Sequence, residues 1–130
     1  MDNLVSIQWL EETESTQDVL RNGIPSYDNL SVVAARLQTA GRGQRGNRWF
    51  SGKGENLTFS VLLKFGNSGG FPSLPVSGQF SISEAISCGI CDYLASKGID
   101  SRIKWPNDIY VRNRKICGML IENSLAGSDI

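Results

Sequence analysis

The stretch SGQFSISEAISCGICDYLASKGI, residues 77–99, decides the class of fold that this sequence predicts. Its apolar side chains recur at intervals of three and four residues, which is the period of an amphipathic helix; they are Phe80, Ile82, Ala85, Ile86, Ile90 and Leu94. Gly98 stands where such a helix would end, because glycine readily takes the left-handed conformation that closes a helix. We therefore expect one long helix with an apolar face.

Segments on both sides of this helix have the composition of β-strands. The clearest is NLTFSVLLKF at 56–65, which is rich in β-branched and aromatic residues. The other predicted strands are residues 5–12, 30–38, 101–105, 108–113 and 114–123. A short helix is expected over residues 13–23, with N-cap candidates at its start and Gly23 at its end. The sequence thus predicts a mixed α+β domain with one sheet and the long helix packed on it.

Composition limits the possible functions. The 130 residues suit about one domain, and 13 basic residues balance 13 acidic ones, so a general affinity for nucleic acid or an anionic membrane is not expected. Histidine is absent, which excludes Ser-His-Asp and Cys-His catalysis. The start MDNLVSIQWLEE lacks the basic segment of a signal peptide, and no run reaches the roughly 18 apolar residues of a membrane span. With three cysteines, an odd number, we expect reduced thiols and a cytoplasmic location.

The segment GRGQRGNRW at 41–49 is the first candidate binding element. It alternates glycines with arginines and closes on an aromatic residue; the members are Gly41, Arg42, Gly43, Arg45, Gly46, Arg48 and Trp49. Glycines let backbone N–H groups approach a ligand closely, and arginines supply forked donors that match phosphate and carboxylate oxygens. A flexible linker is the alternative, but the run is short and joins two predicted strands. We expect a mobile, anion-binding loop that extends to about Gly54.

Other polar residues are candidates with an equally simple structural explanation. The segment IKWPNDIY at 103–110 sets a lysine, an amide and a carboxylate around a Trp-Pro turn, which would suit a metal–nucleotide site or only a turn. Lys115 follows a predicted hairpin tip, where surface lysines are common. The residues Ser15-Thr16-Gln17 could cap the short helix or bind a neutral polar group of a ligand.

Four segments together resemble the landmark motifs of the biotin protein ligase catalytic domain. They are ESTQD at 14–18, QTAGRGQRGNRW at 38–49, KWPNDIY at 104–110 and KICGMLIE at 115–122, in the family's order and at similar separations. The resemblance covers essentially the whole chain and implies a class II aminoacyl-tRNA-synthetase-like α+β fold. It implies that biotin and ATP, with Mg²⁺, give biotinyl-5′-AMP, and that biotin then passes to a lysine of the biotin carboxyl carrier domain of a carboxylase. A homodimer is compatible with the resemblance.

The resemblance also implies a role for individual residues. Those that would bind biotin are Ser15, Thr16, Gln17, Gln38, Arg42, Gly43, Gln44, Lys115 and Gly118. Those that would bind ATP or the adenylate are Gly41, Gly43, Arg45, Gly46, Trp49, Lys104, Asn107 and Asp108. Arg42, Lys104 and Lys115 would offset the negative charge of the reaction, because a carboxylate must attack an α-phosphate. Asp108 would be the ligand for Mg²⁺.

The sequence also departs from the family's pattern. Gln44 stands where many members carry arginine, and no helix-turn-helix segment precedes the domain, so no DNA-binding domain is expected. The chain stops before the Gly/Asn-rich strand and the small β-domain that usually follow, so we expect residues 1–130 to be an incomplete catalytic domain that can be inactive alone. Two other functions stay open: a lipoate ligase or lipoyl transferase, and a small RNA-binding module built on the arginines of 41–49 and Trp49. The motif KWPND favours biotin over lipoate.

Overall fold

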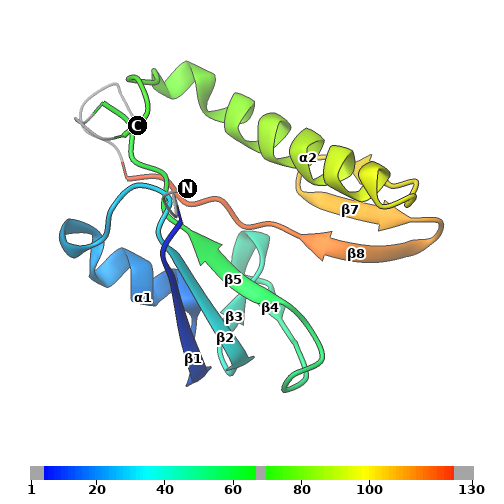
Figure 1. Cartoon of the computed structure of the whole chain (residues 1–130), viewed down its shortest axis with the longest axis horizontal. Helices are drawn as coiled ribbons and strands as arrows, with labels where there is room; N and C mark the ends of the chain where they lie inside the picture. Colours follow the sequence, from blue (N-terminus) through cyan, green and yellow to red (C-terminus); the bar gives the residue numbers. More distant parts are fainter. Residues whose placement is uncertain (1–4, 67–69, 125–130) are drawn as a thin grey trace. The chain divides into compact units, whose positions relative to one another are not determined.

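A computed structural model of the chain describes residues 5–66 and 70–124. The chain divides into two compact units, unit 1 (Met1–Ser73) and unit 2 (Leu74–Ile130), and each is considered by itself (Figure 1). Within the described ranges, no helix combines the length and the apolar character needed to cross a membrane.

Unit 1 is built on a three-stranded sheet in the order β1-β2-β5. The strands are β1 (Ile7–Thr13), β2 (Val32–Gln38) and β5 (Thr58–Val61); β1 pairs with β2 in parallel and β2 with β5 antiparallel. Parallel neighbours need a crossover, and the segment between β1 and β2 contains helix α1 (Thr16–Asn22), which packs against β2 and β5. The buried residues Val33, Ala34 and Ala35 place the core at the central strand.

Local signals fix both ends of α1. The side chain of Ser15 accepts a hydrogen bond from the backbone N–H of Asp18 at 3.4 Å, so Ser15 is the N-cap. At the other end, the N–H of Gly23 donates to the carbonyl of Leu20 at 3.1 Å. The short predicted helix is therefore confirmed, and a turn of 3₁₀ helix, η1 (Ile24–Ser26), follows it.

The segment expected as a mobile loop contains a small β-hairpin. Strands β3 (Gly41–Arg42) and β4 (Arg48–Trp49) pair antiparallel across the turn η2 (Gln44–Gly46). Gly41 is required at its position, because a Cβ there would lie 2.5 Å from Nε2 of Gln38 and 2.7 Å from the carbonyl oxygen of Trp49. The backbone of Gly46 has a φ of +79°, which also favours glycine.

The two faces of the β1-β2-β5 sheet differ. Thr16 on α1 bonds to Ser60, so α1 covers the face to which Ser60 points. The opposite face carries apolar side chains in register that are between 42% and 55% exposed: Ile7 and Trp9 on β1 and Phe59 and Val61 on β5. On this face Arg36 lies over the ring of Trp9 and pairs with Glu11 at 3.1 Å.

Unit 2 contains the long helix and a second three-stranded sheet. After a short 3₁₀ turn, η3 (Val76–Gly78), helix α2 (Gln79–Ser96) ends as predicted: the N–H of Gly98 donates to Ala95 and that of Ile99 to Leu94, at 3.0 and 2.9 Å. These two bonds are a Schellman motif, and Gly98 has the positive φ that it needs. The antiparallel sheet follows in the order β6 (Arg102–Lys104), β7 (Asp108–Val111) and β8 (Arg114–Gly118).

Three sequence-based expectations need correction. The described strands form three separate sheets, not one, because their pairing depends on contacts between distant segments. The predicted strand at 114–123 ends at Gly118. Gly118 pairs with Asp108, and Asp108 is the first residue of β7, so β7 offers no partner to the residues after Gly118. Phe80 and Ala85 of the expected apolar stripe are exposed on α2. Residues 125–130, beyond the expected strand, lie outside the described ranges.

Candidate functional site

A cluster of neutral polar side chains surrounds the start of α1. We call Ser15, Thr16, Gln17, Gln38 and Ser60 the polar cluster. The backbone N–H of Thr16 donates to Oε1 of Gln38 at 2.9 Å, and the hydroxyls of Thr16 and Ser60 lie 2.8 Å apart. Ser15 and Thr16 are buried, although both are polar. The cluster therefore joins α1 to the ends of two strands through hydrogen bonds and not through apolar packing.

Ser60 organises the far side of the polar cluster. Its hydroxyl donates to Oε1 of Gln17 at 2.7 Å. Each hydroxyl has one proton. With the Ser60 proton on Gln17, the Thr16 hydroxyl is the donor of the short contact, in preference to its longer contact of 3.3 Å with Oε1 of Gln38. A chain of bonds thus runs from Thr16 through Ser60 to Gln17. We did not predict Ser60 from the sequence; the available signal was a hydroxyl within the apolar segment TFSV, on the face that α1 covers.

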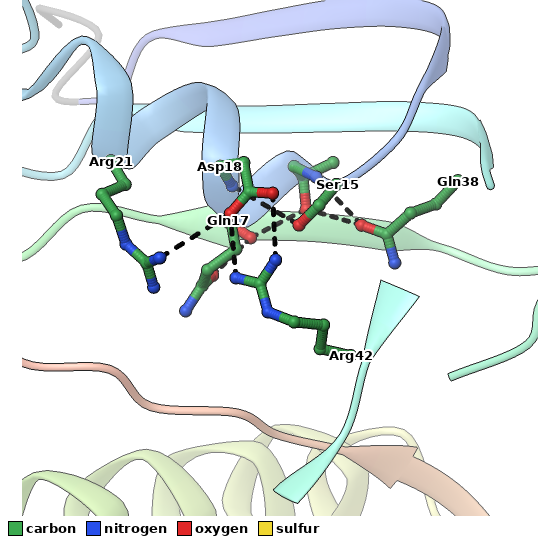
Figure 2. Close-up of polar contacts among 8 residues, drawn as sticks. Ser15, Gln17, Asp18, Arg21, Gln38 and Arg42 are labelled. Atoms are coloured by element: carbon green, nitrogen blue, oxygen red, sulfur yellow. Dashed lines mark hydrogen bonds and ion pairs between the residues drawn. The ribbon is translucent and has the colours of Figure 1, made fainter. Parts of the chain in front are cut away.

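The Asp18–Arg42 ion pair lies beside this cluster (Figure 2). Nη1 of Arg42 is 2.9 Å from Oδ2 of Asp18, and Nη2 is 2.9 Å from Oδ1. Arg21 approaches the same carboxylate at 3.8 Å. The hydrogen bond from Arg42, together with the charges of Arg42 and Arg21, lowers the pKa of Asp18 against an opposing effect of desolvation.

The Gly-rich hairpin brings Arg42 to this place. Gly41 lies in close contact with Gln38, so the strand that carries Arg42 begins at the polar cluster. The turn is closed by the N–H of Gly43, which donates to the carbonyl of Asn47 at 2.7 Å. The other predicted ligand residues of the segment follow around the turn: Gln44, Arg45 and Gly46 are exposed, and Trp49 is half-buried on β4. Their roles in binding stay predictions.

Unit 2 gathers its predicted cations on one face of the β6-β7-β8 sheet. Lys104 faces Asp108 in the β6–β7 register, and Lys115 faces Tyr110 in the β7–β8 register. Nζ of Lys115 lies 2.9 Å from Oδ1 of Asp108, and Nζ of Lys104 lies 5.3 Å from the centroid of the Tyr110 ring. Tyr110 is therefore part of this face, although we did not predict it as a site residue. Gly118 lies in register with Asp108.

Asn107 has a structural role in the turn between β6 and β7. Its side chain is buried, and its Oδ1 accepts a hydrogen bond of 3.1 Å from the hydroxyl of Ser83 on α2. The same hydroxyl lies 3.1 Å from the carbonyl of Pro106, and the carbonyl of Asn107 accepts from Met119 at 3.0 Å. These bonds fix the turn that carries Lys104 and Asp108 against the helix. A role of Asn107 in ATP binding stays a prediction.

The described residues do not form a metal site of their own. No group of three His, Cys, Asp or Glu side chains suited to a metal occurs in the described part of the chain. Asp108, which the sequence suggests as a magnesium ligand, gives one carboxylate oxygen to Lys115. Cys88, Cys91 and Cys117 are free thiols, and burial raises the pKa of Cys117. A protein-held metal centre therefore does not fit these residues.

The predicted residues form two groups, one in each unit. In unit 1 the structure brings together six of them: Ser15, Thr16, Gln17, Gln38, Gly41 and Arg42. In unit 2 it brings together Lys104, Asp108 and Lys115 on one sheet face, with Asn107 in the adjoining turn. The first group offers neutral donors and acceptors beside one guanidinium. The second offers two ammonium groups.

Comparisons with known proteins support one family. The profile of the Biotin/lipoate A/B protein ligase family matches residues 9–129. The bifunctional ligase/repressor BirA of Escherichia coli K12 is 33% identical over 118 residues, which are 90% of this chain and 35% of that protein. The biotin protein ligase of Leishmania major, solved with biotinyl-5-AMP, superposes with a TM-score of 0.65 at 29% identity over 95% of this chain and 53% of that one. The Aquifex aeolicus biotin protein ligase, solved with biotin and ATP, gives a TM-score of 0.68 at 25% identity over 95% of this chain and 48% of that one.

These matches confirm the mixed α+β fold and the resemblance found in the four motifs. The chain spans about half the length of these solved relatives and about a third of the Escherichia coli protein.

Proposed function

Because the chain belongs to the biotin/lipoate A/B protein ligase family, we propose that it forms part of a biotin protein ligase. Such an enzyme joins biotin to ATP as biotinyl-5′-AMP with release of pyrophosphate, and then transfers biotin to a lysine of the biotin carboxyl carrier domain of a carboxylase. The observation that carries the proposal is the polar cluster beside Arg42. Relatives named as biotin ligases, some solved with biotin and a nucleotide, support the choice of biotin over lipoate.

The polar cluster has the chemistry that the ring of biotin requires. The ureido group of biotin is neutral and carries N–H donors next to a carbonyl acceptor. Thr16, Gln17, Gln38 and Ser60 are neutral groups that both donate and accept, and their mutual hydrogen bonds hold them in fixed orientations. A preformed set of this kind binds a neutral polar group without burying an unpaired charge.

The cations have the chemistry that activation requires. The carboxylate of biotin must attack an α-phosphate, and both groups are negative. Arg42, beside the polar cluster, would hold the carboxylate, and Lys104 and Lys115 would offset charge on the phosphate during the reaction. Neither half-reaction needs a covalent enzyme intermediate, so the absence of histidine from the chain does not conflict with this reaction.

Mg²⁺ enters the proposal only as the ion that accompanies ATP. Proteins usually hold Mg²⁺ with nucleotides through phosphate oxygens and one or two carboxylates. Asp108 would be such a carboxylate, but its bond to Lys115 competes with that use. The electrostatic work of the proposal therefore falls on Arg42, Lys104 and Lys115.

We further propose that the protein is cytoplasmic and can self-associate. The exposed apolar residues of the β1-β2-β5 sheet support self-association. Light scattering of the purified chain over a range of concentrations would test it, and a monomer at every concentration would contradict it.

The proposed activity can be tested in a single turnover. The chain, at a concentration above that of biotin, is mixed with MgATP, and biotinyl-5′-AMP is detected by mass spectrometry. We expect the adenylate with biotin and none with lipoate. Loss of one neutral hydrogen bond costs about 1 kcal/mol, so Ser60→Ala should reduce the yield at limiting biotin about fivefold. Ser26→Ala, which removes an exposed hydroxyl bond to the carbonyl of Gly23, should not. Because the chain spans only about half of its solved relatives, biotin binding by calorimetry is the second readout. Absence of both adenylate and biotin binding, or an equal amount of lipoyl adenylate, would contradict the proposal.

A further inference from the structure

Asp18 is the residue in this region whose part in the function is unassigned. It lies in the first turn of α1, directly after the residues of the polar cluster, and its carboxylate faces Arg42 on one side and Arg21 on the other (Figure 2). From this geometry we propose that Asp18 is a positioning residue. It holds the guanidinium of Arg42 in one orientation beside the polar cluster, so that Arg42 receives the carboxylate of the ligand in a fixed geometry. The inference rests on the proposed function.

The two bonds between Asp18 and Arg42 define an orientation as well as a distance. Each carboxylate oxygen of Asp18 meets a different terminal nitrogen of Arg42, both at 2.9 Å. A planar guanidinium and a planar carboxylate that bond in this way share a plane and cannot rotate independently. One bond would fix only the position of the group.

The orientation of Arg42 depends on its side-chain contacts, because the element that carries it is short. It lies on a two-residue strand of a Gly-rich hairpin, and its side chain is only partly buried. A long side chain loses considerable conformational entropy when it is ordered by a ligand. Asp18, in contrast, stands on a helix whose start is fixed by the Ser15 cap and by the bond from Thr16 to Gln38. Asp18 therefore gives Arg42 the same rigid base that carries Thr16 and Gln17.

The charges of the neighbouring residues favour a role for Asp18 in orienting Arg42 over a role as a competitor of the ligand. A carboxylate on Arg42 could also act as a competitor that the anionic ligand must displace. However, Arg21 approaches the same carboxylate, so two cations and one anion leave one net positive charge on this group of three residues. Asp18 therefore does not cancel the positive charge of the two arginines, and its loss would free the orientation of Arg42.

The test is a double-mutant cycle on biotin affinity, measured by calorimetry with the full chain. Asp18→Asn keeps the shape of the side chain but replaces one acceptor oxygen with an NH₂ donor, and we expect it to weaken biotin binding at least about fivefold. Asp18→Glu keeps both acceptor oxygens and should lose less affinity. With Arg42→Ala already present, Asp18→Asn should have no further effect. Glu11→Gln is the matched control, because it breaks an exposed arginine–carboxylate pair on the opposite face of the same sheet; it should change the affinity less than twofold.

Several results would overturn the inference. They are unchanged or tighter biotin binding by Asp18→Asn, or an equal loss with and without Arg42. Nuclear magnetic resonance of the Arg42 guanidinium tests positioning without any ligand: we expect hindered rotation in the parent chain and free rotation in Asp18→Asn. Free rotation in the parent would overturn the inference. Absence of biotin binding by the parent would contradict the proposed function, and the resonance measurement would then decide the inference alone.

Discussion

The two units each hold a predicted anion-binding cation against an aspartate, but in different ways. Arg42 meets Asp18, and Lys115 meets Asp108, both at 2.9 Å and with all four side chains between 31% and 38% exposed. Arginine makes two bonds through a planar fork, whereas the ammonium of lysine is a point charge on a flexible stem. At equal distance and exposure, the first pair fixes an orientation and the second fixes only a position.

This difference suggests that Arg42 and Lys115 have different roles in the proposed reaction. A carboxylate that must attack has to be held in one direction, which suits the fork of Arg42. Charge on a phosphate spreads and moves during the reaction, and a lysine can follow it while it leaves Asp108.

The largest effect is expected from the loss of the Lys115 ammonium, on the rate of adenylate formation. Lys115→Ala should slow formation of biotinyl-5′-AMP at least about tenfold, because a charge-assisted hydrogen bond contributes roughly 1.5–3 kcal/mol. The single-turnover rate measures it. Arg114→Ala is the control, since it removes an exposed cation from the neighbouring position of β8 and should leave the rate unchanged. A parent rate for Lys115→Ala would show that this lysine does not act on the reaction.

Exchanging the two cation types sharpens the comparison directly. Arg42→Lys keeps the charge but loses the fork, so biotin affinity should fall about tenfold, nearly as far as in Arg42→Ala. Lys115→Arg should keep the single-turnover rate within about threefold, because a point charge needs no fixed plane. Calorimetry measures the biotin affinity of Arg42→Lys, and the single-turnover assay measures the rate of Lys115→Arg. If both exchanges had equally small effects, Arg42 would not need a fixed orientation and would not differ from Lys115 in this respect.

A smaller effect is expected on stability in acid. Arg42 lowers the pKa of Asp18, so the pair stabilises the fold fully above the unfolded pKa near 3.8, and this contribution disappears as the pH falls through the folded value. The parent should therefore lose more free energy of unfolding between pH 5 and pH 2 than Asp18→Asn does. The difference should stay below about 1 kcal/mol, since the pair is more than one-third exposed. Urea denaturation at both pH values measures it, and equal losses would contradict the assigned cause.

Helix ends could be predicted from the sequence because their signals are local. Ser15 caps α1 within three residues, and Gly98 closes α2 through bonds to the preceding turn. The strand expected through 119–122 was wrong for the opposite reason: apolar composition is local, but a strand also needs a partner, and β7 provides none beyond Asp108.

The candidate site shows the same limit. The four motifs identified its residues but not their bonds, because Asp18 and Arg42 are 24 residues apart and Thr16 and Ser60 are 44 apart. The signal for Ser60 was weak, a single hydroxyl in an apolar strand, and Tyr110 looked like an ordinary strand residue. The hairpin within 41–49 was missed because two-residue strands have no period to detect.

The central claim is that the polar cluster and the oriented guanidinium of Arg42 bind biotin. Calorimetric titration of biotin into the parent chain and into Arg42→Ala tests it most directly. We expect saturable binding of one biotin per chain by the parent, and an affinity at least about tenfold lower for the variant, in line with the loss of a charge-assisted bond. No saturable binding by the parent, or equal affinities of the two chains, would contradict the claim.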